Sequence, residues 1–335
     1  MSAASRPLRI AVTDAIMSAF SDDLRRTERT HEWVFADPGV SGSARAAIDG
    51  ADVVICSRLT TDDMAGADRV RLVHATGAGV DRIDAEAVPD GVPLCNTGHH
   101  GPAIAEHVIM TALMLRRRAL EADAEMRRGE WRTIATVPGS PPAGVPYHRS
   151  LAGSTLGLIG YGEIGRSVAH LAKAFGMRVV ALRRHPDAGG PGTELLDRVY
   201  GEEQLHPLLR ESDVVVVTAP LTESTRGMID ADALAQLHAD ALIVNVARGA
   251  LIDVDALYAA LAEGRIGGAA IDVWWDAPQG TEAPPVVQRF AALDRVVLTP
   301  HHSGHASEVF TARAADIARN IDLLDAGLPL ERQVR

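Results

Sequence analysis

The chain has 335 residues, of which 47% are hydrophobic, and its formal net charge at pH 7 is −11. This length suits two domains rather than one core, and no apolar stretch is long enough to span a bilayer. The acidic charge argues against nucleic acid and acidic membrane as partners, although a local cluster of arginines could still bind an anionic substrate.

Neither the cysteines nor the histidines are spaced as metal ligands. Cys56 and Cys95 lie in apolar runs and are expected to be small buried hydrophobic residues. The 13 histidines show no spacing typical of a metal site, so we expect none. The first residues lack the long apolar segment of a signal peptide, which favours a cytoplasmic protein.

Short β-like runs alternate with helical patterns along the whole chain, which predicts doubly wound α/β structure. In the first part the expected strands are residues 8–12, 53–56, 72–75 and 93–96. A helix-like segment over residues 103–126 follows, apolar early and charged late, as in a helix that leaves one domain and enters another. Residues 137–146 are rich in Pro and Gly and are expected to form a loop.

The second part is predicted to be a nucleotide domain that starts near residue 151. Its expected strands are residues 156–159, 178–182, 214–218, 242–245, 268–272 and 296–299. A final helix over residues 305–326 has no strand after it and could pack back on the first domain, which would make that domain discontinuous.

A glycine-rich turn joins the first strand of this domain to a helix. Gly160, Gly162 and Gly165 give the pattern G-x-G-x-x-G directly after an apolar strand, which is the context of a dinucleotide-binding loop. The first glycine allows the tight turn, the second lets the backbone approach a pyrophosphate, and the third lets helix and strand pack closely. The helix N-terminus then offers free N–H groups to the phosphates.

Three further motifs stand at predicted strand ends, where ligands bind in open α/β sheets. The glycines of residues 76–81 could present backbone N–H groups to a carboxylate, or could form a plain strand-to-helix turn. Arg248 follows a buried strand. It could cap the end of that strand at the surface, or could donate paired hydrogen bonds to a planar oxyanion. His301 follows Pro300 at another strand end and could be a general acid or base, or a structural histidine.

Taken together, these motifs resemble the D-isomer-specific 2-hydroxyacid dehydrogenase family. The matching segments occur in the family's order and cover most of the chain. They are GAGVDRID (77–84), AIAEHV (103–108), LGLIGYGEIGRSVA (156–169), SDVVVVTAPLTESTRGMID (212–230), NVARGALID (245–253), GAAIDVW (268–274) and LTPHHSG (298–304).

The resemblance implies two doubly wound parallel-sheet domains, with a Rossmann nucleotide domain inserted into a flavodoxin-like substrate domain. The substrate domain would comprise residues 1–112 and 304–335, and the dinucleotide-binding domain residues 113–303. The active site would lie in the cleft between the domains, and the protein would be a homodimer.

The resemblance also implies roles for individual residues. Arg248 would bind the substrate carboxylate and polarise the 2-carbonyl, and His301 would protonate that oxygen as hydride arrives. Backbone at Ala78, Gly79 and Val80 would contact the carboxylate. The residues expected to bind the cofactor are Gly160, Gly162, Glu163, Ile164, Gly165, Arg183, Arg184, Thr218, Ala219, Pro220, Thr225, Val246, Ala247, Asp272 and Gly304, with Asp272 holding the nicotinamide carboxamide.

The sequence lacks two carboxylates that the family usually has. Ala277 stands where the family usually has the Glu that orients the catalytic histidine, and Asp276, Glu282 or a water could replace it; we favour Asp276 over no carboxylate at all. Arg183 stands where the family has the acid that holds the ribose 2′-hydroxyl. Because arginine pairs well with a phosphate, we expect NADP(H) rather than NAD(H), although Arg183 and Arg184 could also stack on adenine or lie on a solvated turn.

The sequence does not fix the substrate side chain. His99 and His100 are candidate substrate-binding residues and hint at a polar or anionic arm, whereas Trp274 and Trp275 could line the cleft or belong to the core. The leading hypothesis is an NAD(P)H-dependent 2-oxoacid reductase, and the second is a reductase of a phosphonate analogue. The alternative of another class is an NAD(P)-sensing protein similar to corepressors.

Overall fold

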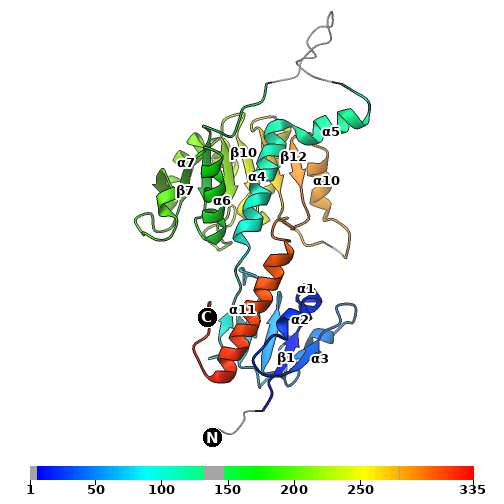
Figure 1. Ribbon diagram of the computed structural model, residues 1–335. Helices are drawn as coiled ribbons and strands as arrows, with labels where there is room; N and C mark the ends of the chain where they lie inside the picture. Colours follow the sequence, from blue (N-terminus) through cyan, green and yellow to red (C-terminus); the bar gives the residue numbers. More distant parts are fainter. Residues whose placement is uncertain (1–5, 132–146, 279) are drawn as a thin grey trace, which may run out of the picture. The chain divides into compact units, whose positions relative to one another are not determined.

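The computed structural model describes residues 6–131, 147–278 and 280–335 (Figure 1). Two compact units account for the chain, the first with residues 1–100 and 305–335 and the second with residues 101–304. The resemblance predicts domain divisions after residues 112 and 303, and the compact units divide after residues 100 and 304. Each unit is built on its own parallel sheet.

The first unit contains a five-stranded sheet in the order β2-β1-β3-β4-β5. Its strands, all parallel, are β1 (Arg9–Val12), β2 (Glu32–Phe35), β3 (Val53–Cys56), β4 (Leu72–Ala75) and β5 (Leu94–Cys95). Its helices are α1 (Ala15–Ala19), α2 (Ser21–Leu24), α3 (Ser43–Ile48) and α11 (Ser307–Ala326), with a 3-10 turn at Ala85–Ala87. This is the strand order of flavodoxin-like sheets.

Both faces of this sheet are buried. Val54 and Val73 belong to one apolar cluster together with Ile48 of α3, whereas Val53 and Leu72 belong to a second cluster with Ile317 of α11. Successive residues of a strand point to opposite faces, so each apolar run supplies both clusters. The C-terminal helix therefore completes the core of the first unit.

The second unit contains a seven-stranded sheet in the order β12-β11-β10-β9-β6-β7-β8. The strands are β6 (Thr155–Ile159), β7 (Arg178–Leu182), β8 (Arg198–Tyr200), β9 (Val214–Val217), β10 (Leu242–Asn245), β11 (Gly268–Ile271) and β12 (Val296–Leu298). The chain moves outward in opposite directions from β6 and β9, which makes the boundary between these strands the switch point where dinucleotides bind in Rossmann folds.

Helices cover both faces of the second sheet. They are α4 (Gly101–Arg117), α5 (Ala119–Arg127), α6 (Glu163–Ala174), α7 (Leu205–Glu211), α8 (Ala231–Leu234), α9 (Val254–Ala262) and α10 (Pro285–Ala291), with 3-10 turns at Thr193–Leu195, Glu202–Gln204 and Gly249–Leu251. Helices α4 and α6 lie side by side on one face (Figure 1). The predicted doubly wound fold of both domains is confirmed.

Two details differ from the sequence-based expectation. The single helix predicted over residues 103–126 is broken at Arg118, whose φ of 51° is left-handed, so that α4 ends and α5 begins there. The edge strands β2 and β8 were not expected, because each is only partly buried and lacks the continuous apolar run of an inner strand. Within the described ranges, no helix is both long and apolar enough to cross a membrane.

Candidate active site

The glycine turn after β6 has the geometry that each glycine was expected to provide. Gly160 has φ of 98°, and a Cβ there would lie 2.7 Å from the backbone N of Ala219. A Cβ on Gly165 would lie 2.7 Å from the carbonyl oxygen of Gly160, so this glycine lets α6 pack on the turn. Gly162 differs, because a Cβ there would meet nothing within 4 Å. The open space at Gly162 lies at the N-terminus of α6, as a pyrophosphate requires.

The segment after β9 closes the other side of the switch point. The Thr218 hydroxyl donates to the Gly160 carbonyl at 2.8 Å, which ties this segment to the glycine turn. The Thr225 hydroxyl donates to the Pro220 carbonyl at 2.8 Å and so fixes the loop that follows. These contacts explain why the sequence places small and hydroxyl-bearing residues here.

A pocket of about 610 Å³ opens beside this turn. Its lining combines apolar walls with charged side chains from the ends of β7 and from Glu202–Gln204. The residues include Gly160, Tyr161, Arg183, Arg184, His185, Glu202, Glu203, Ala219, Pro220, Ser224 and Thr225. Both arginines of the predicted ribose site are therefore at the cofactor-binding edge of the sheet.

The two arginines of this pocket are not equivalent. Arg184 is exposed and pairs with Glu202 at 3.3 Å. Arg183 lies with its guanidinium carbon 5.8 Å from the ring centroid of Tyr161, and its Nη1 is buried without a hydrogen-bond partner among the described residues. A buried guanidinium N–H without an acceptor is costly, so this atom fits an anionic ligand such as a phosphate.

These features fit a nicotinamide dinucleotide. The open position at Gly162 and the N-terminus of α6 would hold the pyrophosphate, and the pocket at Arg183 would hold the adenosine. A bound nicotinamide supplies or accepts hydride. Glu163 and Ile164, the first residues of α6, are where the resemblance places the backbone donors.

Arg248 lies on a turn after β10 that Asn245 builds. The Asn245 side chain accepts from the backbone N–H of Ala247 at 3.1 Å and donates to the carbonyl of Arg248 at 2.9 Å. A Cβ on Gly249 would lie 2.6 Å from the carbonyl carbon of Trp274, so a larger residue could not follow Arg248 here. Val246, on the same turn, is buried. The position of Arg248 is thus set by its neighbours on the turn.

His301 lies on a turn after β12, with φ of 56°. Asp272 organises this turn: its carboxylate accepts from the Thr299 hydroxyl at 2.6 Å and from the backbone N–H groups of His302 and Ser303, each at 3.0 Å. Burial opposes ionisation, but the hydrogen bonds outweigh it and hold the pKa of Asp272 below its usual value. Gly304, at the end of the turn, is buried.

The two tryptophans support both turns from inside the second unit. Trp274 donates its Nε1–H to the Thr299 carbonyl at 3.0 Å, and Trp275 donates to the Ile252 carbonyl at 2.7 Å. The Trp275 ring stacks on Phe290 with centroids 5.6 Å apart. Of the two roles left open by the sequence, the structure places both residues against the core.

The segment that usually carries the family's Glu is exposed here. Asp276 and Ala277 both lie on the surface of the second unit. Asp276 has no hydrogen-bond or ion-pair partner among residues 6–131, 147–278 and 280–335. A role for Asp276 beside His301 stays a prediction.

The predicted substrate residues of the first unit lie at the carboxyl ends of β4 and β5. Ala78 and Gly79 are exposed after β4, and the Asn96 side chain donates to the Ala78 carbonyl at 2.8 Å. Val80 is partly buried and packs beside the core. The hydrogen bond from Asn96 therefore holds an exposed backbone segment in place. A carboxylate site needs such accessible backbone N–H groups.

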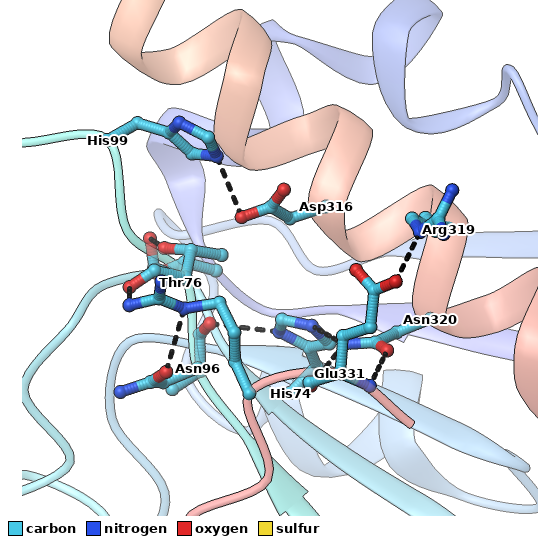
Figure 2. Close-up of polar contacts among 11 residues, drawn as sticks. His74, Thr76, Asn96, His99, Asp316, Arg319, Asn320 and Glu331 are labelled. Atoms are coloured by element: carbon cyan, nitrogen blue, oxygen red, sulfur yellow. Dashed lines mark hydrogen bonds and ion pairs between the residues drawn. The ribbon is translucent and has the colours of Figure 1, made fainter. Parts of the chain in front are cut away.

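His99 and His100 are adjacent in sequence but differ in surroundings. His99 has φ of 71° and its Nε2 lies 2.9 Å from Asp316 of α11 (Figure 2). His100 is half-buried, and burial lowers its pKa to about 3, so it is neutral near pH 7. Of these two residues, only His100 has a buried ring nitrogen, Nδ1, that is without a hydrogen-bond partner among the described residues.

Sequence reasoning missed Tyr161 and Thr299. Tyr161 lies between the first two glycines and contacts Arg183, and Thr299 connects Asp272 to the His301 turn. Tyr161 lies inside the G-x-G-x-x-G motif and Thr299 inside the T-P-H motif. These positions were the signals that could have identified both residues.

Comparison with known proteins agrees with this geometry. Residues 109–303 match the family model of the D-isomer specific 2-hydroxyacid dehydrogenase NAD binding domain. The glyoxylate reductase of Pyrococcus furiosus is 33% identical over 82% of this chain and 78% of its own length. The hydroxypyruvate reductase of Thermotoga maritima is 32% identical over 78% of this chain and 80% of its own. A crystal structure from Thermus thermophilus is 28% identical, with a TM-score of 0.75 over 98% of this chain and 100% of that chain.

Proposed function

We propose, from the premise that this chain belongs to the D-isomer specific 2-hydroxyacid dehydrogenase family, that it reduces a 2-oxoacid to the D-2-hydroxyacid and prefers NADPH. The chain is an NAD(P)-dependent dehydrogenase of 2-hydroxyacids. The observation that carries the proposal is that two hydrogen-bonded turns, which carry Arg248 and His301, lie at the carboxyl edge of the seven-stranded sheet.

In the proposed reaction, Arg248 binds the substrate carboxylate and polarises the 2-carbonyl. Its planar guanidinium suits both tasks, because it can donate two parallel hydrogen bonds. His301 donates a proton to the carbonyl oxygen as that oxygen gains charge, and takes the proton back in the reverse direction. Backbone at Ala78 and Gly79 completes carboxylate binding. The Asn245 and Asp272 networks keep both turns in place during these steps.

The experiment that tests this function is a substrate panel. The purified protein is mixed with NADPH or NADH and a series of 2-oxoacids that includes glyoxylate, hydroxypyruvate and longer chains, and the nicotinamide absorbance is followed. We expect oxidation of the cofactor with at least one 2-oxoacid. Tight cofactor binding with no turnover across the panel would refute the proposal and favour an NAD(P)-sensing protein.

The preference for NADPH is supported by the unpartnered Nη1 of Arg183. A 2′-phosphate would supply the acceptor that this atom lacks, whereas Arg184 is already paired with Glu202. Replacing Arg183 with Ser should lower kcat/KM for NADPH by roughly 10- to 100-fold, the effect of one charge-assisted interaction, and change the value for NADH little. Arg184→Ser is the matched variant and should have a smaller effect. Equal kcat/KM values of the native protein for NADH and NADPH would overturn the preference.

Asp276 is our candidate partner for His301 in place of the family's Glu. If it acts there, Asp276→Asn should shift the acid–base profile of kcat/KM, because a carboxylate favours the protonated imidazole. If no carboxylate lies beside His301, the imidazole is less biased toward its protonated form, and reduction should fall off at a lower pH than in relatives that have the Glu. An unchanged profile in Asp276→Asn would remove this residue from the mechanism.

We further propose that the protein forms a homodimer through α5. None of the residues of this helix is buried, and Leu120 and Met126 are 50% and 53% exposed. Exposed apolar side chains on one short helix fit an interface with a second copy. Light scattering should give the mass of a dimer for the native chain and a smaller mass for Leu120→Glu with Met126→Glu. A monomeric native chain would contradict this.

A further inference from the structure

Tyr161 lies between the first two glycines of the turn after β6 and lines the pocket beside that turn. The turn is tied to the neighbouring strand, because the Gly160 N–H donates to the Leu182 carbonyl, at the end of β7, at 3.1 Å. The chain continues from Leu182 into Arg183, whose own N–H donates to the Tyr200 carbonyl at 2.9 Å. The backbones of Tyr161 and Arg183 are therefore held at neighbouring strand ends, and side-chain contacts decide which way the two side chains point.

The Tyr161 ring lies against the guanidinium of Arg183. The guanidinium carbon is 5.8 Å from the ring centroid, which is within the range of a cation–π contact. The Nη1 atom of Arg183 is buried and has no hydrogen-bond partner in the described part of the chain. Because a cation–π contact uses the face of the ring and no hydrogen-bond acceptor, the ring orients the guanidinium and leaves Nη1 for an acceptor in the pocket.

No carboxylate takes over this orienting role. Arg183 forms no ion pair with any residue that the structure describes, and Glu202 of the same pocket pairs with Arg184 instead. A carboxylate beside Arg183 would accept the N–H groups that a phosphate needs, and its negative charge would repel the phosphate. An aromatic ring holds the cation without either effect.

The Tyr161 hydroxyl anchors the ring at its other end. It donates to the Gly192 carbonyl, in the loop that leads from β7 to the 3-10 turn at Thr193–Leu195. Burial raises the pKa of this hydroxyl, so it keeps its proton near pH 7. Gly192 has φ of 81°, and a Cβ there would lie 3.1 Å from Cδ of Arg166 and 3.3 Å from the Tyr161 hydroxyl oxygen. The glycine therefore lets this loop close on the tyrosine.

We propose that Tyr161 is a positioning residue for cofactor choice, because its ring holds the Arg183 guanidinium where it binds the 2′-phosphate of NADPH. This inference rests on the proposed NADPH preference and names a second residue on which that preference depends. Tyr161 acts through Arg183 and does not handle the reacting atoms. Its loss should therefore raise the KM for NADPH and leave kcat at saturating NADPH near the native value.

The test measures nucleotide binding by calorimetry, without any 2-oxoacid. The probes are adenosine 2′,5′-bisphosphate and adenosine 5′-monophosphate, because they differ only in the 2′-phosphate. We expect the native protein to bind the bisphosphate roughly 10- to 100-fold more tightly. Tyr161→Leu should lower this ratio by roughly 3- to 10-fold, the effect of one cation–π contact, and should change the affinity for the monophosphate little. Tyr161→Phe keeps the ring and should keep most of the ratio.

Tyr258→Leu is the matched control. Tyr258 also contacts an arginine of the second unit, with the Arg289 guanidinium carbon 4.7 Å from its ring centroid, but it does not line the pocket. This variant should keep the native ratio.

A double variant tests whether Tyr161 acts through Arg183. Adding Tyr161→Leu to Arg183→Ser should lower the ratio no further than Arg183→Ser does alone, because the side chain that the ring positions is already absent. A further loss of the same factor as in the single variant would overturn the positioning role.

The remaining outcomes separate this inference from the proposed function. A native ratio in Tyr161→Leu would overturn the positioning role and leave the NADPH preference intact, and Tyr161→Met gives the same comparison should the leucine variant not fold. An equal loss for both nucleotides would show that Tyr161 only supports the fold, which also overturns the role. Equal binding of both nucleotides by the native protein would refute the NADPH preference together with this inference, whereas the substrate panel tests 2-oxoacid reduction independently.

Discussion

The carboxyl edges of the two parallel sheets are built in different ways. At the seven-stranded sheet, ligand-binding geometry comes mainly from backbone: a turn at Gly160, an open position at Gly162 and a helix N-terminus. At the five-stranded sheet it comes from side chains brought together by the fold, where Asn96 donates to the Ala78 carbonyl and accepts from Arg332. The first design suits a cofactor with invariant phosphates, and the second suits a variable substrate arm.

This difference indicates which positions can be substituted without disturbing the fold. A Cβ at Gly160 or Gly165 would meet backbone at 2.7 Å, so those positions tolerate no exchange without movement of the chain. Arg332, which donates to the Asn96 side chain at 3.3 Å beside the backbone after β4, is exposed, so other polar side chains could replace this pair. Cofactor binding and substrate choice are thus separable properties of this molecule.

The largest effect is expected at the seven-stranded edge, in His301→Ala. Removing a general acid should lower kcat by about 10²- to 10⁴-fold. Asp272 and Thr299 hold the turn, so NADPH affinity, measured by fluorescence titration, should change little. His238→Ala, at a half-buried histidine of the same unit that lies 3.5 Å from Asp213, is the control. Near-native turnover in His301→Ala would contradict the assignment.

The next effect separates two glycines of the same turn. Gly162→Ala should fold normally because its Cβ meets nothing, yet bind NADPH roughly 10- to 100-fold more weakly because the methyl group takes the place of the pyrophosphate. Gly160→Ala should instead lower the Tm by several degrees, about 1–2 kcal/mol of strain, since its φ is left-handed and Ala219 is close. Calorimetry and cofactor titration of both variants measure this. Normal NADPH affinity in Gly162→Ala would mean that the phosphates bind elsewhere.

A smaller effect is expected at acidic pH, where the first unit should lose stability before the second. His74 of the first unit is fully buried between the Ala75 carbonyl and Asn320 (Figure 2), and burial lowers its pKa to about 4. The unfolded chain takes up a proton near pH 6.5 and the native one only near pH 4, so the free energy of unfolding falls as pH drops through this window. Between pH 7 and pH 5 the loss is about 2 kcal/mol.

Urea unfolding followed by circular dichroism at both pH values measures this loss, and amide hydrogen exchange locates it. Exchange should accelerate first in the first unit. His74→Gln should flatten the pH dependence even if it lowers stability overall. A pH dependence that is unchanged in this variant would assign the loss to other groups.

Much of the fold and of the second unit's site could be predicted from the sequence, because those features are local. The G-x-G-x-x-G turn, the Arg248 turn and the His301 turn are each specified by a few consecutive residues next to an apolar strand. The break at Arg118 was missed because a non-glycine residue with positive φ gives no sequence signal. The pairing of His99 with Asp316 and the hydrogen bond between His74 and Asn320 join residues far apart in the chain, so no local pattern could reveal them.

The central claim is the reduction of a 2-oxoacid by direct hydride transfer at the Arg248 and His301 turns. Its most direct test uses NADPH deuterated at C4 of the nicotinamide and a 2-oxoacid, followed by chiral analysis of the product by mass spectrometry. The account predicts a D-2-hydroxyacid with deuterium at C2, formed with cofactor of one C4 stereochemistry and about 10²- to 10⁴-fold more slowly by His301→Ala. An L-product, a product without deuterium, or no product from any 2-oxoacid would contradict it.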